Sequence, residues 1–382
     1  MPLPQIARDV RAWARTDANP LTAALQKARE EARDIIDLAG AMAHENGLVP
    51  PPERLRGLAD DAVSRALRYR PDPRGQRDAR EAVAAFYQRR GLATHPDQIL
   101  LTPGSSVGYL CLLRALCNAG DEVLVPQPGY PLFDDLCTFA GARQRYYHLR
   151  DDGGHWRIDL EDLAFQITPR TRVVALVSPH NPLGVVLSAN ELAAIASLCE
   201  KHGMTLVFDE VFSEYIASPF LPRPQGGCVT VLLNGLSKML WLPGLKVGWM
   251  RVSEGASDLL DVLEYAGDLL LPVSEIGQAM TAGLLETADG DAASFAVEIA
   301  RRRDRVIEVL GHPVVPSQGG VYVCVPVDGD DDEVALRALE NGVAVHPGHY
   351  YALDGHVVFT CLANESRLVE GARRLRETLA AR

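Results

Sequence analysis

Four short segments of this 382-residue chain place polar side chains directly after apolar runs that are typical of buried β-strands. They are Thr102-Pro-Gly-Ser-Ser106, Ser178-Pro-His-Asn-Pro-Leu-Gly184, Phe208-Asp-Glu-Val-Phe212 and Asn234-Gly-Leu-Ser-Lys238. Ligands of open α/β sheets bind at the carboxyl ends of the strands. The four segments are therefore candidates for one common site.

Each of the first three segments also has a purely structural interpretation. The serine hydroxyls and free N–H groups of 102–106 could hold a phosphate at a helix N-terminus, yet a capped helix start needs the same residues. Asn181 lies in a loop shaped by two prolines and a glycine, which is also the composition of a plain turn. Asp209 ends an apolar strand, where a carboxylate is costly unless a ligand cation or a structural arginine pairs with it.

Lys238 follows another apolar strand and is one of only four lysines, the others being Lys27, Lys201 and Lys246. A lysine in such a loop is usually solvated. A partly buried lysine, however, has a depressed pKa and can become a Schiff-base nucleophile. Lys238 is therefore the candidate nucleophile.

The order and spacing of these segments resemble the class I/II aminotransferase family of fold-type I pyridoxal-phosphate enzymes. The shared signature is Asn-Pro-x-Gly, then Asp-Glu, then Ser-Lys with a following Gly-x-Lys/Arg-x-Gly. Its gaps are 28 residues from Asn181 to Asp209 and 29 from Asp209 to Lys238. The resemblance extends from Tyr69-Arg-Pro-Asp-Pro-Arg-Gly75 to Pro347-Gly348. It implies a PLP-transferase fold and an aminotransferase with pyridoxal 5'-phosphate as its cofactor.

The resemblance also implies a role for each matched residue. Lys238 would form an aldimine with the cofactor and carry the proton at the substrate Cα. Asp209 would pair with the protonated pyridine nitrogen, and Asn181 would donate to the phenolate oxygen. The remaining cofactor contacts would be Tyr130, which stacks on the ring, and the phosphate ligands Gly104, Ser105, Ser106, Ser237 and Lys246.

Two further matches concern the partner subunit and the substrate. Tyr69 matches a tyrosine that reaches the phosphate of the neighbouring subunit's cofactor, so the resemblance implies a homodimer with shared sites. Gly40 matches, loosely, a glycine beside the substrate carboxylate. The implied small-molecule partners are an amino donor and an amino acceptor.

The sequence departs from the family pattern at the cofactor. Lys246 replaces an arginine and loses its bidentate fork. Gly235 replaces a serine three residues before the lysine. Phe212 replaces a tyrosine three residues after the aspartate, which removes one hydrogen bond to the cofactor phenolate and predicts an upward shift of the aldimine pKa.

A larger departure concerns the substrate. In the segment Gly355–Ala363 the family has an arginine, four residues before the alanine, that binds the substrate α-carboxylate, and here this position is read as Phe359. The sequence therefore predicts that the usual carboxylate clamp is missing or has moved, so that small amino acids are poor substrates. Candidates for a replacement are the arginines that flank Tyr69, namely Arg68, Arg70 and Arg74.

The elements that position these residues follow from the alternation of apolar runs and helical stretches between about Gln98 and Arg251. This pattern predicts an α/β fold whose large domain has a mostly parallel sheet flanked by helices. Ser188 to Glu191 matches a capping box, and Gly203 would close the helix that it opens. The expected organisation is an arm of residues 1–49 packing with the small domain, a large cofactor-binding domain of residues 50–275 and a smaller α+β domain of residues 276–382.

Composition excludes several other functions. The 38 Lys and Arg residues against 50 Asp and Glu residues give a net charge of −12, which disfavours nucleic acid and anionic membranes as partners. Seven scattered cysteines without a C-x-x-C pair predict neither a disulfide framework nor a metal site. We find no signal-peptide pattern and no apolar run long enough for a membrane span, so the expected location is cytoplasmic.

Two alternatives to an aminotransferase remain open at this stage. One is a pyridoxal-phosphate-dependent lyase or β/γ-replacement enzyme acting on an amino acid or an S-adenosylmethionine-like substrate. The other is a regulatory protein that binds the cofactor without turnover, which Lys238, Asp209 and Asn181 together disfavour, as does the lack of a basic region.

Overall fold

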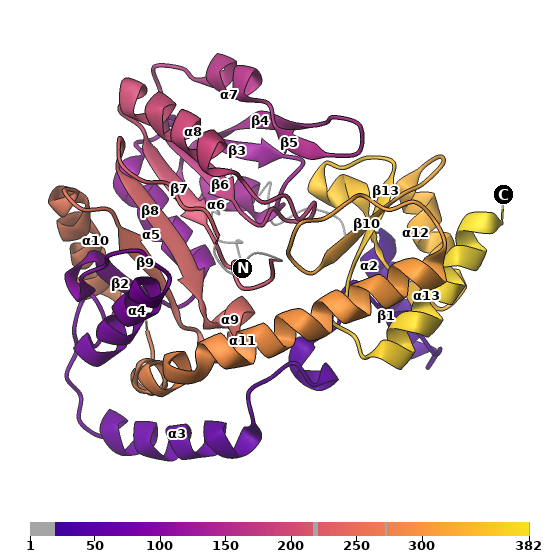
Figure 1. Cartoon of the computed structure of the whole chain (residues 1–382), viewed down its shortest axis with the longest axis horizontal. Helices are drawn as coiled ribbons and strands as arrows, with labels where there is room; N and C mark the ends of the chain where they lie inside the picture. The colour runs from indigo at the N-terminus through magenta and orange to yellow at the C-terminus, as the bar shows by residue number, and fades with distance from the viewer. Residues whose placement is uncertain (1–19, 217–220, 272, 382) are drawn as a thin grey trace, which may run out of the picture.

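The computed structural model describes residues 20–216, 221–271 and 273–381, which form an eight-stranded sheet and a three-stranded sheet with their helices (Figure 1). The strands of the large sheet, in chain order, are β2 Ile99–Thr102, β3 Glu122–Gln127, β4 Arg143–Asp151, β5 Trp156–Ile158, β6 Thr171–Val177, β7 Thr205–Asp209, β8 Thr230–Gly235 and β9 Gly248–Val252. Their spatial order is β2-β9-β8-β7-β6-β3-β4-β5. The five strands from β8 to β4 are parallel, and β2, β9 and β5 run antiparallel to their neighbours, which confirms the mostly parallel sheet.

Helices cover both faces of this sheet. The helices of this region are α3 Pro52–Ala66, α4 Arg77–Arg89, α5 Ser105–Leu116, α6 Leu132–Ala140, α7 Leu160–Gln166, α8 Ala189–His202, α9 Leu236–Met239 and α10 Ser257–Leu270, with 3-10 turns at Ala43–Asn46, Pro96–Gln98 and Pro243–Leu245. Of these, α4 to α8 and α10 contact strands of the sheet, whereas α3 packs on the long helix Glu275–Leu310. Strand β6 shows the consequence for packing, because Val174 and Leu176 belong to one apolar core whereas Val173 and Ala175 belong to the other. A strand covered on both faces is apolar without alternation.

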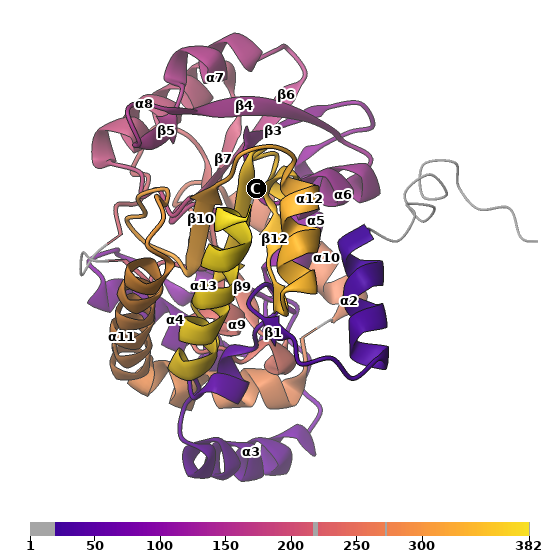
Figure 2. The same cartoon turned by 90° about the vertical axis from the view of Figure 1, so that its right-hand side faces the viewer.

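The small sheet is antiparallel and consists of β10 Tyr322–Pro326, β13 His356–Thr360 and β12 His346–Pro347, in that spatial order. The helix α12 Asp331–Glu340 and the 3-10 turn Gly348–Tyr351 contact this sheet, and α12 also contacts α13 Glu365–Ala380, which in turn packs on α11 Glu275–Leu310. The first described helix, α2 Pro20–Glu30, contacts α12, and β1 Ile36–Asp37 pairs with β11 Val343–Ala344. The N-terminal segment therefore lies beside the small sheet (Figure 2), while the domain boundaries at residues 50 and 275 stay a prediction.

Helix α11 spans 36 residues, or about 54 Å at 1.5 Å per residue. It contacts α3 and α4 beside the large sheet and α13 beside the small one, and Figure 1 shows it crossing between the two regions. Near its C-terminal end, Arg302 donates to the carbonyl oxygens of Leu362 and Ala363 at 2.9 and 3.0 Å and to that of Asn46 at 2.9 Å. One helix thus joins both sheets.

Local signals in the sequence explain several element ends. The Ser188 N–H donates to the Glu191 carboxylate at 2.8 Å, and the Glu191 N–H donates to the Ser188 hydroxyl at 3.3 Å, which is a complete capping box at the start of α8. Gly203 ends α8 with a φ of 65°. Among the described residues, no helix is long and apolar enough to cross a membrane.

Candidate active site

One pocket of about 290 Å³ brings the four candidate segments together at the carboxyl ends of the strands. Every predicted cofactor contact except Tyr69 lines it: Gly104, Ser105, Ser106, Tyr130, Asn181, Asp209, Ser237, Lys238 and Lys246. The structure therefore brings together the residues that the strand-end argument grouped, and their roles at a site stay a prediction.

Asp209 ends β7 and is only 7% exposed. Burial raises the pKa of its carboxyl to about 7 and the neighbouring Glu210 adds to this, whereas the Val211 N–H, the Tyr109 hydroxyl and the Lys238 amine oppose it. The Val211 N–H donates to the carboxylate at 3.1 Å. Burying an ionised carboxylate costs free energy, so a cationic partner bound in the pocket would stabilise Asp209.

Glu210 is fully buried next to Asp209 and pairs with Arg223 at 2.5 Å. This ion pair gives Glu210 a cationic partner of its own, although its charge still contributes to the raised pKa of Asp209. Asp209 is thereby left as the carboxylate that the pocket itself must satisfy.

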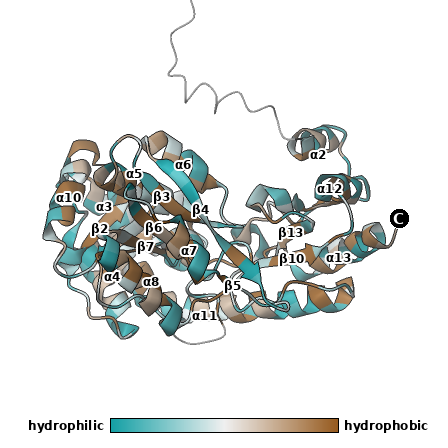
Figure 3. Cartoon of the chain, turned by 90° about the horizontal axis from the view of Figure 1, so that it is seen from above, coloured by the Kyte–Doolittle hydropathy of each residue, from teal (hydrophilic) through white to brown (hydrophobic). Residues whose placement is uncertain are grey.

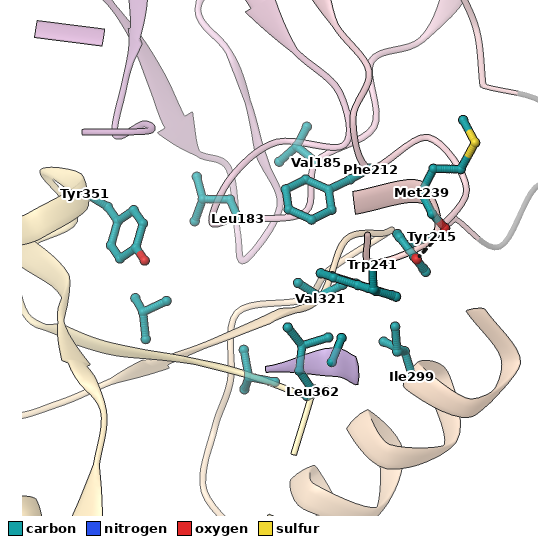
Figure 4. Packing of buried hydrophobic residues seen from close by; sticks show 14 of the residues in the cluster. Leu183, Val185, Phe212, Tyr215, Met239, Trp241, Ile299, Val321, Tyr351 and Leu362 are labelled. Carbon is teal, nitrogen blue, oxygen red and sulfur yellow. Dashed lines mark hydrogen bonds between the residues drawn. The ribbon is translucent and has the colours of Figure 1, made fainter. Parts of the chain in front are cut away.

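Lys238 stands on the short helix α9, directly after β8. Its side chain is open to the pocket, yet the surrounding protein lowers the pKa of its amine, and only Asp209 opposes this effect. The Tyr215 hydroxyl donates to the carbonyl oxygens of Lys238 and Met239 at 2.8 and 3.1 Å, which fixes the end of α9 (Figure 4). A held, easily deprotonated amine is what a Schiff-base nucleophile needs.

Asn181 is 6% exposed and lies in the loop after β6. Its side-chain oxygen is buried and has no hydrogen-bond partner among the described residues. Gly184 of the same loop explains part of the motif, because a Cβ there would lie 2.0 Å from the Ser317 hydroxyl and 2.4 Å from the Gly319 carbonyl oxygen. The loop is pressed against the segment that leads into β10.

The opposite end of the pocket offers donors for an anion. Helix α5 begins at Ser105, so its free N–H groups and positive dipole end face the pocket beside the hydroxyls of Ser105 and Ser106. Ser237 and the ammonium of Lys246 line the same space. Hydroxyls, free amides and one ammonium form a donor set that fits a phosphate group.

Comparison with known proteins identifies the family. The sequence profile described as "Aminotransferase class I and II" matches residues 33–375. The chain belongs to the class I and II aminotransferase family. Enzymes of this family use pyridoxal phosphate. The residues present fit that group, since they combine hydrogen-bond donors for a phosphate, a lysine, a buried carboxylate and a buried side-chain amide.

Relatives in this family match nearly the whole chain. Arginine–pyruvate transaminase AruH of Pseudomonas aeruginosa is 32% identical over 341 residues, which cover 85% of this chain and 86% of the relative. Aspartate/prephenate aminotransferase of Thermus thermophilus is 30% identical over 369 residues, covering 92% and 94%. A structure of Thermus thermophilus aspartate aminotransferase with maleate superposes with a TM-score of 0.88 at 26% identity, covering 99% of this chain and 100% of that one.

The structure explains one departure from the family pattern at the cofactor end. A Cβ at Gly235 would lie 2.8 Å from the Val247 carbonyl oxygen and 2.8 Å from the Gly248 Cα. The backbones of β8 and β9 approach too closely here for the serine that the family usually has. Lys246, which stands where the family usually has an arginine, lines the pocket and forms no ion pair among the described residues.

Three residues that the resemblance singled out lie away from this pocket. Tyr69 is 70% exposed and lines a separate hollow with Leu271 and Val273. Gly40 is exposed in the turn after β1, where its N–H donates to the Asp37 carboxylate at 2.7 Å. Phe359 is fully buried. Within this one chain, the structure brings none of the three to the cofactor contacts.

The pairing of the small sheet shows which way Phe359 faces. Residues directly opposite each other in antiparallel strands share a face, and Phe359 pairs with Val323 whereas Thr360 pairs with Tyr322, which lines the pocket. We call the face that carries Tyr322, Cys324, His346, Val358 and Thr360 the inner face of the small sheet. Phe359 lies on the other face, in the core, so the position that the sequence suggested for the clamp points away from the pocket.

Among the residues that the structure describes, no arginine lines this pocket. Val358 and Thr360 precede and follow Phe359 in the chain and lie on the inner face, and neither of them carries a charge. Burial lowers the pKa of His346, which disfavours its cationic form. Among the pocket-lining residues that the structure describes, the only cationic side chains are Lys238 and Lys246. That the usual carboxylate clamp is missing or has moved stays a prediction, and Phe359 is not the residue that bears on it.

Sequence reasoning missed two pocket residues. Tyr109, on α5, faces Asp209 and favours its ionised form. Its position one helical turn after Ser105 and Ser106 was the available signal. Tyr322, on β10, enters from the small sheet, and nothing local in its sequence indicates that it reaches the strand ends of the large sheet.

Proposed function

We propose that the chain is a pyridoxal-phosphate-dependent aminotransferase that moves an amino group between an amino acid or amine and a 2-oxo acid. The observation that supports the proposal is that Lys238, Asp209 and Asn181 line one pocket together with several hydrogen-bond donors for a phosphate group. When bound, the cofactor supplies an electron sink for charge that develops at the substrate Cα.

The residues of the chain would divide the work around that group. Asp209, which costs energy as an isolated carboxylate, would be stabilised in its ionised form by a protonated ring nitrogen. Lys238 would hold the cofactor covalently and then, as a free amine of lowered pKa, take and return the proton at the substrate Cα. Ser105, Ser106 and Lys246 would anchor the phosphate.

We propose further that the enzyme acts as a homodimer with shared sites. Tyr69 is exposed, and further exposed apolar side chains occur just before it, on α10 and just after α10, namely Leu67, Val262, Tyr265, Leu269, Leu270, Leu271 and Ile276. Helix α10 packs closely on the segment that follows Tyr69, because a Cβ on Gly267 would lie 2.1 Å from the Pro73 carbonyl oxygen. Apolar patches of this kind mark protein interfaces. Light scattering tests this by measuring the mass in solution. We expect twice the chain mass for the wild type and the mass of a single chain for the double variant Tyr265→Asp with Leu269→Asp.

The arginines beside Tyr69 differ in their availability as a replacement clamp. Arg74 forms ion pairs with Glu264 and Asp261, and Arg65 forms one with Asp78. Arg68 and Arg70 are exposed and form no ion pair among the described residues. In a homodimer these two would be the ones presented to the neighbouring subunit with Tyr69.

The test of the proposed function is a half-reaction. The purified holoenzyme is mixed with a panel of amino acids and amines, without an acceptor, and its visible absorption is followed. Transamination converts the enzyme to a stable aminated cofactor and releases an oxo product in equal amount. Loss of a β- or γ-substituent with the original spectrum regained would instead establish a lyase or replacement enzyme, and a spectrum that no donor alters would point to a binding protein.

A further inference from the structure

Phe212 leaves the pocket without a hydroxyl at the position three residues after Asp209. The ring is 3% exposed, and Figure 4 shows it among Leu183, Val185 and Val321 of one apolar cluster. Phe212 therefore offers the pocket a carbon surface and no hydrogen-bond donor.

A second aromatic residue stands against Phe212 and carries the hydroxyl that Phe212 lacks. The rings of Phe212 and Tyr322 meet edge to face, with centroids 6.0 Å apart and planes at 83°. Both residues line the same pocket as Asn181 and Lys238. Among the pocket-lining residues that the structure describes, Tyr322 alone comes from the small sheet.

Hydrogen bonds on both sides of Tyr322 hold it in this place. Two residues before it, the Gly320 N–H donates to the Tyr215 carbonyl oxygen at 2.7 Å. Two residues after it, the Cys324 thiol donates to the Pro182 carbonyl oxygen at 3.6 Å, a normal distance for sulfur. Pro182 directly follows Asn181, so the second contact ties β10 to the loop that carries the pocket amide.

Tyr322 and Asn181 line the same pocket, and the Tyr322 hydroxyl stays protonated. Burial raises the pKa of Tyr322 well above its usual value and Tyr130 adds to this, while a hydrogen bond with the Asn181 side chain opposes it. A neutral phenol and a carboxamide beside each other are two donors to a single acceptor.

We propose that Tyr322 replaces the missing hydroxyl of Phe212, donating a hydrogen bond to the cofactor's phenolate oxygen beside Asn181. The inference rests on the proposed function, because it concerns the same cofactor. It assigns a positioning role to the small sheet, which otherwise contributes no residue to the described pocket. It also reverses the expectation from Phe212 alone, since the phenolate retains two neutral donors and the cofactor's Schiff-base pKa need not rise.

The test is a spectroscopic titration of the holoenzyme in the absence of substrate. The visible absorption is followed against pH for wild type and Tyr322→Phe. A lost donor to the phenolate destabilises the deprotonated form, so the apparent pKa of Tyr322→Phe is expected to rise by about one pH unit, a tenfold change in proton affinity. Adding Phe212→Tyr to Tyr322→Phe restores the hydroxyl from the other ring and is expected to return the pKa towards the wild-type value.

Tyr351→Phe is the matched control. The Tyr351 ring lies 6.2 Å from Tyr322 but Tyr351 does not line the pocket, so its variant is expected to titrate like wild type. Equal pKa values for wild type and Tyr322→Phe, within about 0.2 unit, overturn this inference alone, as does an equal rise in Tyr351→Phe. A wild-type protein that forms no visible, borohydride-reducible band overturns the proposed function, and this inference with it.

Discussion

The pocket is built by two regions that differ in how closely they keep to the family. On the large-sheet side, strand ends and the N-terminus of α5 place a lysine, a buried carboxylate, an amide and phosphate donors around one space. On the small-sheet side, the inner face of the sheet presents Tyr322, Val358 and Thr360 and no arginine or lysine. The large-sheet side thus carries the residues expected to hold the cofactor, whereas the inner face of the small sheet does not carry the arginine expected to bind the substrate.

This difference teaches that reaction chemistry and substrate recognition are separable in this fold. A cofactor makes the same demands on every member of the family, namely a nucleophile, a ring partner and a phosphate cradle. A substrate carboxylate demands only some cation or donor, which several parts of the molecule could supply. The four predictions that follow test this separation.

The largest effect is expected on the large-sheet side, from Lys238→Ala. Loss of both the covalent anchor and the proton carrier should lower kcat by about 10⁴-fold or more while cofactor still binds. Peptide mapping after borohydride reduction of the wild type should find the cofactor on Lys238. A label on Lys201 or Lys246 would contradict the assignment, and Lys201→Ala is the control that should keep full activity.

On the small-sheet side, Phe359→Ala should cost stability rather than alter specificity. Removing a fully buried ring from the core is expected to lower the free energy of unfolding by about 3 to 5 kcal/mol, whereas the control Phe359→Leu should cost less than about 1.5 kcal/mol. Chemical denaturation measures both. Phe359→Arg would bury an unpaired cation and should fail to fold. If Phe359→Ala instead changed the relative kcat/KM of different donors, the ring would have to lie at the pocket.

Asp209→Asn should separate activity from stability. An amide cannot balance a protonated ring, so kcat should fall by about 10² to 10³-fold. In the apoprotein, where no ring cation balances Asp209, its ionised carboxylate lowers stability instead of supporting activity. The pKa of Asp209 is raised from 3.8 to about 7, so its contribution to stability is complete below about pH 4 and is lost as the pH rises through 7.

Thermal unfolding of the apoprotein between pH 5 and 8 tests that sign. Wild type should lose stability over this interval on the order of a few kcal/mol, and Asp209→Asn should lose less. Parallel curves for the two proteins would show that Asp209 does not carry the raised pKa. Ser188→Ala, which removes a distant helix cap, is a control for general destabilisation and should leave the slope unchanged.

The smallest effect concerns the free carboxylate of the amino donor. A charge-assisted pair contributes about 1.5 to 3 kcal/mol, so an enzyme with an arginine clamp prefers an amino acid over its amide or ester by about tenfold or more. Here we expect a preference below about threefold in kcat/KM. Efficient turnover of glutamate or alanine at low concentration would mean that another cation binds the carboxylate. Arg68→Ala and Arg70→Ala would then be tested first.

Much of the large-sheet side could be predicted from the sequence because its signals are local. A parallel strand with both faces buried is apolar along its whole length, so the polar residue that follows it, such as Asp209 or Lys238, stands out. The capping box at Ser188 is equally local. In contrast, β4 was not predicted, because its sequence is rich in arginine and other polar residues, as the hydrophilic colour of this strand in Figure 3 shows.

The small-sheet side could not be predicted for two physical reasons. All five residues of β13 except His356 are buried, so its sequence shows no alternation, and a shift of one residue exchanges the two faces of the strand. Phe359 was assigned by counting four residues back from Ala363 in the family pattern, and such a count does not show which face of the strand a residue occupies. Tyr322 reaches the pocket only because Gly320 and Cys324 bond to loops more than 100 residues earlier in the chain, and no short-range pattern carries that information.

Helix α11 makes the spacing between the two regions a matter of counting residues. Gly277 lets the helix lie against the Leu245 carbonyl, next to Lys246, and Arg302 grips the chain after β13. The 25 steps between Gly277 and Arg302 amount to about 38 Å. A single inserted or deleted residue would turn one end by about 100° relative to the other and break one of these grips. The length of α11 thus fixes the distance and relative rotation of its two contacts. We therefore expect relatives of this protein to keep the length of this helix while the loops around it gain and lose residues.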